Sequence, residues 1–267
     1  GPGGKHYWAI PEQEPLAMVL LYRLDLFRAA GLDPEKPPRN WDELHEYARK
    51  IADPSRGIYA LGFYTGQFGS WGVYSYLCSA GVQTVTQQSD ATWRATFDTP
   101  EAVTAFEFVD GLQKEEVTKN GKTGPMAYRS SDLWGKWSDG QLAMMFNYSG
   151  GGQVNIDPQL IGMAPVPKGP TGKSSSEVNC RMMGIFAGQK DLRVRAAAWE
   201  YMRFIDSDEA RKIFTQTMVE QGAWRQVTPK RLRQFGYPEL AKLIPQGIED
   251  AGGGSEEALR QGTPEDY

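Results

Sequence analysis

Apolar and polar positions follow two different periods along this chain, and segments of the two kinds alternate. The short apolar runs 16–22 and 142–146 predict buried strands, because turn residues bound them and they are too short for helices. In residues 41–51, apolar side chains recur every three or four positions behind Asn40, a good N-cap, which predicts an amphipathic helix. This alternation of strands and helices predicts an α/β fold.

The same periods and the capping residues predict the remaining elements. We expect further strands over residues 5–10, 58–63, 93–97, 160–166 and 178–187. Further helices are expected over 25–30, 71–80 and 238–243. One more should follow a cap at Asp98 or Thr99, and another should lie near Trp134 and Trp137. A further helix should follow a cap at Asp191, and the next should run through Ile213 and Phe214. The helix after Asp98 or Thr99 is expected to bury Val103, Phe106, Val109 and Leu112, and residues 119–125 are expected to form an exposed polar loop.

Small and polar residues come directly after the predicted strand 142–146. Asn147, Tyr148 and Ser149 stand first, and three glycines follow them. In open α/β sheets, ligands bind at the carboxyl ends of the strands, so these side chains are placed to meet a ligand. The glycines would let the backbone approach it closely. An ordinary exposed turn has the same composition, so both interpretations stay open at this stage.

Length, composition and charge narrow the class of protein. A chain of 267 residues forms one large domain or two small ones. With 40% hydrophobic and 23% charged residues, the composition is that of a folded and not a disordered chain. The net charge is −4 and no basic face is evident, so we expect no nucleic-acid partner. The 8 Trp and 12 Tyr suit either a binding surface or a large core.

Residues that carry metal, redox or catalytic chemistry are sparse. Cys78 and Cys180 stand far apart without a CxxC motif, and they are either two buried thiols or one disulfide. His6 and His45 have no Ser or Cys partner motif. Loop carboxylates are present without the pairing that a glycosidase needs, at Glu14, Asp139 and Glu177. We therefore expect no metal, no cofactor and no enzyme activity.

Five segments, in order along the chain, resemble motifs of the extracellular solute-binding proteins of ABC importers, the group that includes maltose-binding protein. Residues 4–11 resemble GK-x-Y-x-x-P, residues 22–32 resemble YNKDLF-x-x-AGL with Arg23 where Asn is commonest, and residues 37–44 resemble PPKTWDEL. Residues 140–144 resemble the G-x-x-AM strand, and residues 196–214 resemble the family's paired helices. None of the motifs is specific alone, but five in the family's order make the resemblance strong.

The resemblance implies a two-lobed α/β fold like that of type II periplasmic-binding proteins, which closes on a solute as a hinged clamp. The family has a sizeable N-terminal segment that this chain lacks, so we expect a fragment. It should comprise mainly the C-terminal lobe, the hinge strands and part of the first lobe's helices. The predicted divisions are a hinge strand of the first lobe (1–11), the α/β C-terminal lobe (12–187) and helices that normally pack on the missing first lobe (188–267).

The implied function is the solute-binding, non-catalytic component of an ABC transporter. The expected partners are a small solute, with a sugar as the best fit, the transporter's membrane subunits and the missing N-terminal lobe. The expected location is periplasmic or extracellular, with a lipid on the absent N-terminus as one form of anchoring. A sensory or protein-interaction module derived from such a protein is the alternative, and a glycoside-acting enzyme fits less well. Half a clamp cannot enclose a solute, so we expect weak or no binding by this chain alone.

The candidate ligand contacts are carried over from their positions in the matching motifs. Aromatic faces would pack on the C–H faces of a sugar ring, while carboxylate, amide and guanidinium groups would bind its hydroxyls. Core packing is the alternative for the aromatic residues, and a surface ion pair is the alternative for the arginine. Gly150 stands where maltose-type binding usually has a Trp, which argues against oligosaccharide stacking there. The candidates are Gln13, Glu14, Tyr64, Gln67, Phe68, Trp71, Asn147, Tyr148, Ser149, Arg181 and Trp224.

Overall fold

A computed structural model gives the fold of the protein and describes residues 9–11, 16–148, 156–175, 177–179, 181–224 and 227–244. The chain divides into two compact units. Met18–Glu177 form the first, which we call the sheet unit. The described parts of Gly1–Ala17 and Val178–Tyr267 belong to the second, which we call the terminal unit. The predicted divisions at residues 11 and 187 stay a prediction.

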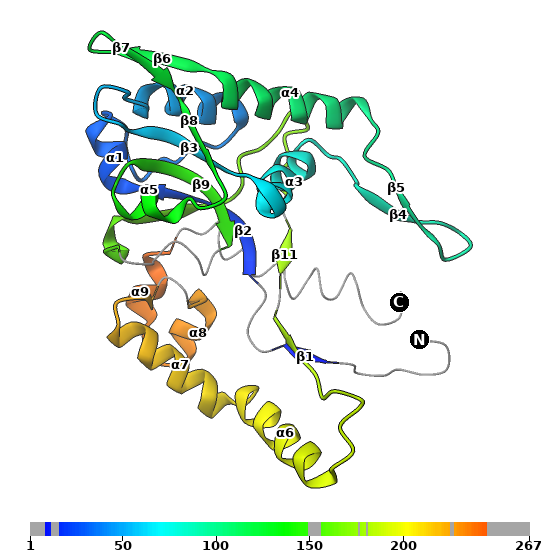
Figure 1. Cartoon of the computed structure of the whole chain (residues 1–267). Coiled ribbons are helices and arrows are strands. Elements are labelled where there is room, and N and C mark those ends of the chain that lie inside the picture. Colours follow the sequence, from blue (N-terminus) through cyan, green and yellow to red (C-terminus); the bar gives the residue numbers. More distant parts are fainter. Residues whose placement is uncertain are drawn as a thin grey trace. The chain divides into compact units, whose positions relative to one another are not determined.

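The sheet unit is built on a mixed sheet with the strand order β10-β2-β9-β3-β8 (Figure 1). Its strands are β2 (Leu16–Arg23), β3 (Tyr59–Tyr64), β8 (Ala127–Ser130), β9 (Leu142–Tyr148) and β10 (Ile161–Ala164). β9, β3 and β8 run parallel to one another, whereas β2 is antiparallel to both β9 and β10. The predicted strand 142–146 is confirmed, with every one of its side chains buried. The α/β class is confirmed with it.

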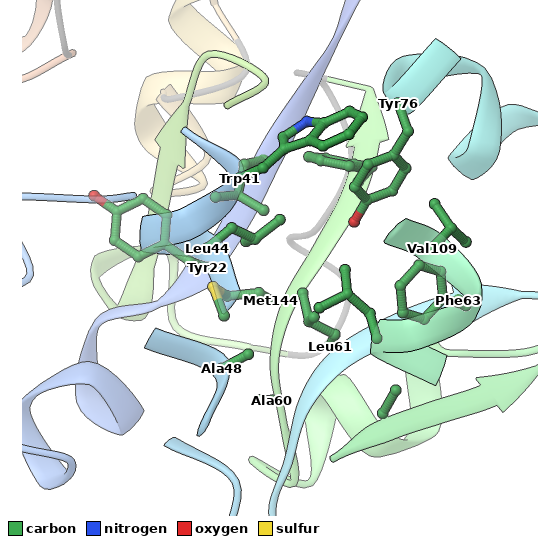
Figure 2. Close-up of a cluster of buried hydrophobic side chains, with 14 of the residues drawn as sticks. Tyr22, Trp41, Leu44, Ala48, Ala60, Leu61, Phe63, Tyr76, Val109 and Met144 are labelled. Carbon is green, nitrogen blue, oxygen red and sulfur yellow. The ribbon is translucent and has the colours of Figure 1, made fainter. Parts of the chain in front are cut away.

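Helices pack on this sheet around one large apolar cluster. The helices of the sheet unit are α1 (Leu24–Ala29), α2 (Trp41–Ile51), α3 (Gly69–Ser79), α4 (Pro100–Lys114) and α5 (Trp134–Ser138), with the short 3-10 turns η1 (Gly66–Phe68) and η2 (Pro158–Leu160). Figure 2 shows side chains from β2, β3 and β9 meeting those of α2, α3 and α4. The Trp41 ring stacks on Phe108 at 4.4 Å, and its indole N–H donates to Ser79 Oγ at 3.1 Å. Burial of this apolar surface is the main stabilising contribution to such a core.

Side-chain caps begin several helices where the sequence predicted them. Asn40 accepts a hydrogen bond from the backbone N–H of Glu43 at 2.9 Å, at the start of α2. Of the two candidate caps before α4, Thr99 is the one that caps, by accepting from the N–H of Ala102. Asp191 likewise accepts from the N–H of Arg193 at the start of a later helix. Each such cap satisfies one of the backbone donors that a helix start leaves unpaired.

The buried face predicted for α4 is wrong in half of its residues. Val109 and Leu112 are buried, but Val103 is 54% exposed and Phe106 is 47% exposed. The residues that complete the buried face are Ala102 and Ala105. In the first half of α4 small alanines fill the buried positions, and the larger Val103 and Phe106 face outward. In the first half of α4 the buried positions therefore lie one residue earlier than predicted, about 100° around the helix, whereas the second half is as predicted.

Residues 119–125, predicted as a polar loop, instead belong to a hairpin. β6 (Glu116–Lys119) pairs antiparallel with β7 (Lys122–Pro125), and Asn120 and Gly121 connect them with φ values of 50° and 76°. Asn-Gly between two strands is the usual sequence of a tight hairpin turn, since both residues tolerate positive φ. The sequence therefore contained the signal, and the polarity of the flanking residues concealed it. A second hairpin joins β4 (Val85–Gln87) and β5 (Trp93–Ala95).

The terminal unit contains short strands and four described helices. β1 (Ile10–Pro11) pairs with β12 (Met182–Met183), and β11 (Val178–Asn179) pairs with Leu16 and Ala17 at the start of β2. The single strand predicted over 178–187 is therefore two shorter ones, and most of the strand predicted over 5–10 lies outside the described residues. The helices are α6 (Leu192–Ile205), α7 (Asp208–Glu220), α8 (Pro229–Gln234), which the sequence did not predict, and α9 (Pro238–Lys242). Among the described residues, no helix has both the length and the apolar content to cross a bilayer.

Arg23 holds the turn before β9 in place. Its side chain is almost fully buried and donates from Nη1 to the carbonyl oxygen of Trp137 at 2.7 Å. It also forms a two-point ion pair with Asp25, with distances of 2.9 and 2.7 Å. Burial by itself would raise the pKa of Asp25, but the hydrogen bonds and charge of Arg23 outweigh burial and hold that pKa below its usual value. Arg23 thus fixes the turn from which β9 starts.

Candidate functional site

Aromatic and polar side chains gather where two parallel strands of the sheet unit end. β3 ends at Tyr64 and its neighbour β9 ends at Tyr148, so both carboxyl ends lie at the same edge of the sheet. This is the edge at which α/β sheets bind ligands. Four rings meet here, and we call them the aromatic platform: Tyr64, Phe68, Trp71 and Tyr148.

The rings of the platform form a connected chain of edge and tilted contacts. The ring centroids are 6.4 Å apart for Tyr64 and Phe68, 5.1 Å for Phe68 and Trp71, and 6.0 Å for Trp71 and Tyr148. These spacings lie within the range in which aromatic pairs attract one another. Trp71 is 42% exposed, so core packing does not account for it. The platform therefore offers an accessible apolar face.

Local geometry explains why residues 64, 68 and 71 come together. The chain leaves β3 at Tyr64 and turns at Gly66, whose φ of +68° lies in the left-handed region that glycine adopts easily. The turn η1 then leads straight into α3, which carries Trp71 on its first turn. A side chain at position 69 would place its Cβ 3.2 Å from the carbonyl oxygen of Tyr64, so glycine there keeps the turn tight.

Asn147 uses both ends of its amide at this edge, one to reach the neighbouring strand β3 and one within its own strand β9. Its Nδ2 donates to the Tyr64 hydroxyl at 3.1 Å, and its Oδ1 accepts from the backbone N–H of Tyr148 at 2.8 Å. Burial raises the pKa of Tyr64 to about 12, although the hydrogen bond from Asn147 acts in the opposite direction. Tyr64 therefore keeps its proton at neutral pH. The amide and the phenol are thus oriented before any ligand arrives.

Glu177 joins the site from a distant part of the sequence. The Tyr148 hydroxyl donates to Glu177 Oε1, and both residues are half-buried. The backbone explains the placement, because the N–H of Met18 donates to the carbonyl oxygen of Glu177 at 3.0 Å and Met18 lies opposite Tyr148 in the β2–β9 pair. The sequence marks Glu177 only as a loop carboxylate and does not predict this position. Short-range sequence patterns carry no sign of the pairing that brings it here.

The structure thus brings part of the predicted set together. Tyr64, Phe68, Trp71, Asn147 and Tyr148 form one group, and Gln67 lies exposed on the adjoining turn η1. Exposed Arg181 and half-buried Trp224 belong to the terminal unit. Gln13, Glu14 and Ser149 lie outside the described residues. That any of these residues contacts a ligand stays a prediction.

In the described part of the chain, the side chains to consider for catalysis or metal binding are the histidine, the cysteine and clusters of carboxylates. His45 of α2 pairs with Glu115, which also accepts from Arg49, and this group joins α2 to the end of α4. Cys78 is a free thiol whose pKa is raised by burial, and this disfavours the thiolate form that reacts as a nucleophile. Over the described residues, no three His, Cys, Asp or Glu side chains form a group that could hold a metal ion.

Comparison with known proteins places these observations in a family. The family model described as "Bacterial extracellular solute-binding protein" matches residues 2–212. A putative binding protein of Brucella abortus is 28% identical over 203 residues, which are 75% of this chain and 47% of that protein. The sn-glycerol-3-phosphate-binding periplasmic protein UgpB of Pectobacterium atrosepticum is 25% identical over 199 residues, 72% of this chain and 43% of that protein. The chain therefore spans about half the length of these relatives.

Solved structures show the same fold. An ABC transporter solute-binding protein from Thermotoga lettingae, bound to α-D-tagatose, matches with a TM-score of 0.66 and 21% identity over 87% of this chain and 57% of that chain. Another, from Agrobacterium radiobacter in complex with ribitol, matches with a TM-score of 0.59 and 27% identity over 81% of this chain and 53% of that chain. The predicted fold class, that of type II periplasmic-binding proteins, is confirmed.

Proposed function

Since this chain belongs to the bacterial extracellular solute-binding protein family, we propose that it serves an ABC importer as the part of the binding component that holds a small hydroxylated solute, a sugar or a polyol. The observation that carries this proposal is the aromatic platform with Asn147 at its edge. A platform of this kind packs against the C–H faces of a sugar or polyol, and the neighbouring amide and phenol oxygens and nitrogens bind its hydroxyl groups. Relatives of similar fold hold tagatose and ribitol, which supports the same ligand class here.

The role is binding without catalysis, in the periplasm or outside the cell. The family description and the periplasmic UgpB relatives support this location, with a lipid anchor as one form that it can take. The membrane subunits of an ABC importer are the proposed protein partners. No observation favours the alternative of a sensory or interaction module.

A further protein segment is proposed to cover α6 and α7. Trp199, Phe204, Ile213 and Phe214 on these helices are 44–50% exposed, and several large apolar side chains exposed on neighbouring turns usually mark a surface that packs against protein. The relatives that the chain matches are about twice as long as the matched part, so they contain enough additional chain to form a second lobe. This is consistent with the predicted assignment of residues 188–267 to helices that pack on a first lobe.

Isothermal titration tests the proposed function. The complete product of the gene that encodes this chain would be titrated with D-tagatose, ribitol, D-mannitol and maltose, and the chain alone would be titrated in parallel. We expect at least one sugar or polyol to bind the complete product with a Kd in the micromolar range or below, and the chain alone to bind it at least a hundredfold more weakly. Equal affinity for both proteins would contradict the two-lobed clamp.

Two controls separate binding from the other candidate activities. Incubation of the same sugars with the protein, followed by chromatography, should return them unchanged, and hydrolysis would indicate a glycoside-acting enzyme. A Trp71→Ala variant should bind at least 30-fold more weakly while its thermal unfolding stays close to that of the original protein, because Trp71 is 42% exposed and lies outside the buried core cluster. If the variant retained full affinity, the platform would not be the binding site.

A further inference from the structure

We infer that Glu177 restricts this site to uncharged, hydroxyl-bearing ligands and excludes their phosphate esters. The inference rests on the proposed function and specifies its ligand class. The relatives differ in whether the ligand carries a phosphate: the UgpB proteins are named for sn-glycerol 3-phosphate, whereas other similar proteins hold ribitol or tagatose. A phosphate ester and a free polyol differ by nearly two negative charges at neutral pH, so a carboxylate in the site discriminates strongly between them.

The position of Glu177 at the platform is fixed by both its backbone and its side chain. Its carbonyl oxygen accepts from Met18, the residue paired with Tyr148 across β2 and β9. Its side chain accepts the hydroxyl hydrogen of Tyr148, whose ring contacts Trp71 at 6.0 Å. The carboxylate therefore belongs to the same connected group as the exposed face of the platform.

The hydrogen-bond directions at this end of the site favour a ligand that donates. An ionised carboxylate accepts hydrogen bonds and donates none, so a ligand group that binds to it must donate. Sugar and polyol hydroxyls carry hydrogens to donate to such oxygens. A phosphate group at neutral pH offers mainly acceptor oxygens and negative charge, so both the hydrogen bonding and the electrostatics oppose it.

Arg181 is the one cation among the predicted ligand contacts, and a guanidinium suits phosphate. It belongs to the terminal unit, whereas Glu177 and the platform belong to the sheet unit. A site in which Arg181 dominates would prefer phosphate esters. If Glu177 sets the preference, the uncharged ligand binds more tightly, and if Arg181 sets it, the phosphate ester does. A single binding experiment therefore distinguishes the two.

The test compares matched ligand pairs on the complete gene product by isothermal titration at pH 7.5. The pairs are D-mannitol with mannitol 1-phosphate, ribitol with ribitol 5-phosphate, and D-tagatose with tagatose 6-phosphate. We expect the uncharged member of the pair that binds to have at least a hundredfold lower Kd than its ester. Preference for an ester would overturn the inference and leave the solute-binding function standing. If no probe of either kind binds, the proposed function fails together with the inference.

Two substitutions assign the discrimination to Glu177. In Glu177→Gln the amide oxygen still accepts from Tyr148 but the charge is lost, so the ratio of the two Kd values should fall at least tenfold. Glu177→Asp keeps the charge and should keep the ratio within about threefold of the original protein. Glu107→Gln, at an exposed position of α4, removes the same charge away from the platform and should change nothing. An unchanged ratio in Glu177→Gln overturns the inference, and thermal unfolding of each variant shows that it is folded.

Discussion

The aromatic platform and the α6–α7 surface both expose large apolar side chains, but they differ in the polar groups beside them. At the platform, Asn147 and Glu177 are held by hydrogen bonds to Tyr64 and Tyr148, so donors and acceptors have set directions. On α6 and α7 the neighbouring charges form surface ion pairs, Arg203 with Glu200 and Arg211 with Asp206. Oriented polar groups next to an apolar face suit a small polar ligand, whereas an apolar face among solvated charges suits the packing of another protein segment.

Removing one tryptophan from each surface gives the strongest test that the platform binds the ligand and the α6–α7 surface does not. Trp71→Ala should raise the Kd of the bound sugar or polyol at least 30-fold, about 2 kcal/mol of binding free energy, because the ligand loses its largest apolar contact. Trp199→Ala, which removes an equally exposed ring from α6, should leave that Kd unchanged. Isothermal titration of both variants measures the difference. Similar losses of affinity in the two variants would remove the distinction between the surfaces.

The next largest effect concerns Arg23, which lies at the end of β9 opposite the platform. Arg23→Ala should lower the free energy of unfolding by about 2 kcal/mol, because it leaves the Trp137 carbonyl and Asp25 without their buried donor. Urea unfolding followed by tryptophan fluorescence measures this loss. Arg49→Ala provides the control, since Arg49 is a largely exposed member of its ion pair and should cost less than 1 kcal/mol. Equal losses would mean that Arg23 is no more than a surface charge.

A smaller effect is expected from the amide that joins the two strands. Asn147→Ala should weaken ligand binding about tenfold, near 1.4 kcal/mol, since Tyr64 and the ligand hydroxyls lose an oriented partner. The phenol should respond as well, because the hydrogen bond from Asn147 lowers the pKa of Tyr64 against the effect of burial. We therefore expect the Tyr64 pKa to rise above about 12 in the variant. Ultraviolet titration of tyrosine ionisation, compared with a Tyr64→Phe variant, measures this, and a fall would contradict the assigned contact.

The smallest effect is a pH-dependent one away from the platform. Burial would raise the pKa of Glu115, but the hydrogen bonds from His45 and Arg49 outweigh it, so the pKa lies below its ordinary value of about 4.3. Because the folded-state pKa is lowered, the contribution to stability is present above the unfolded-state pKa and is lost as pH falls through the folded-state value. Glu115→Gln should therefore cost about 0.5–1 kcal/mol at pH 7, and this cost should shrink as the pH falls through the lowered folded-state pKa.

Thermal or urea unfolding at several pH values measures that difference. The carbonyl oxygen of Glu115 accepts from the backbone N–H of Met126, just before the start of β8, and so Glu115 lies at the end of the sheet opposite the platform. Its ion pair should therefore affect stability alone. The Kd for ligand at pH 7 should therefore be the same in Glu115→Gln and in the original protein. A difference between the two proteins that is constant with pH would contradict the assigned ion pair.

The amino-acid sequence by itself determined the elements whose signals are local. The buried strand 142–146, the caps Asn40 and Asp191 and the family resemblance all follow from residues close together in the chain. Most of the platform belongs to this class, because Tyr64, Phe68 and Trp71 lie within eight residues and one tight turn brings them together. The Asn-Gly turn at residues 120–121 was equally local, and it was overlooked because the flanking residues are polar.

The tertiary structure alone decided the features that depend on contacts between distant residues. Glu177 reaches Tyr148 only because its backbone accepts a hydrogen bond from Met18, which lies opposite Tyr148 in the sheet. The buried face of α4 depends on which side of the helix meets its neighbours α3 and β8, and that side carries Ala102 and Ala105 and not Val103 and Phe106. Local periodicity records which residues are apolar, but strand pairing and packing distance are set by partners elsewhere in the chain. For that reason a sequence pattern can predict the elements of this site and still miss the carboxylate that completes it.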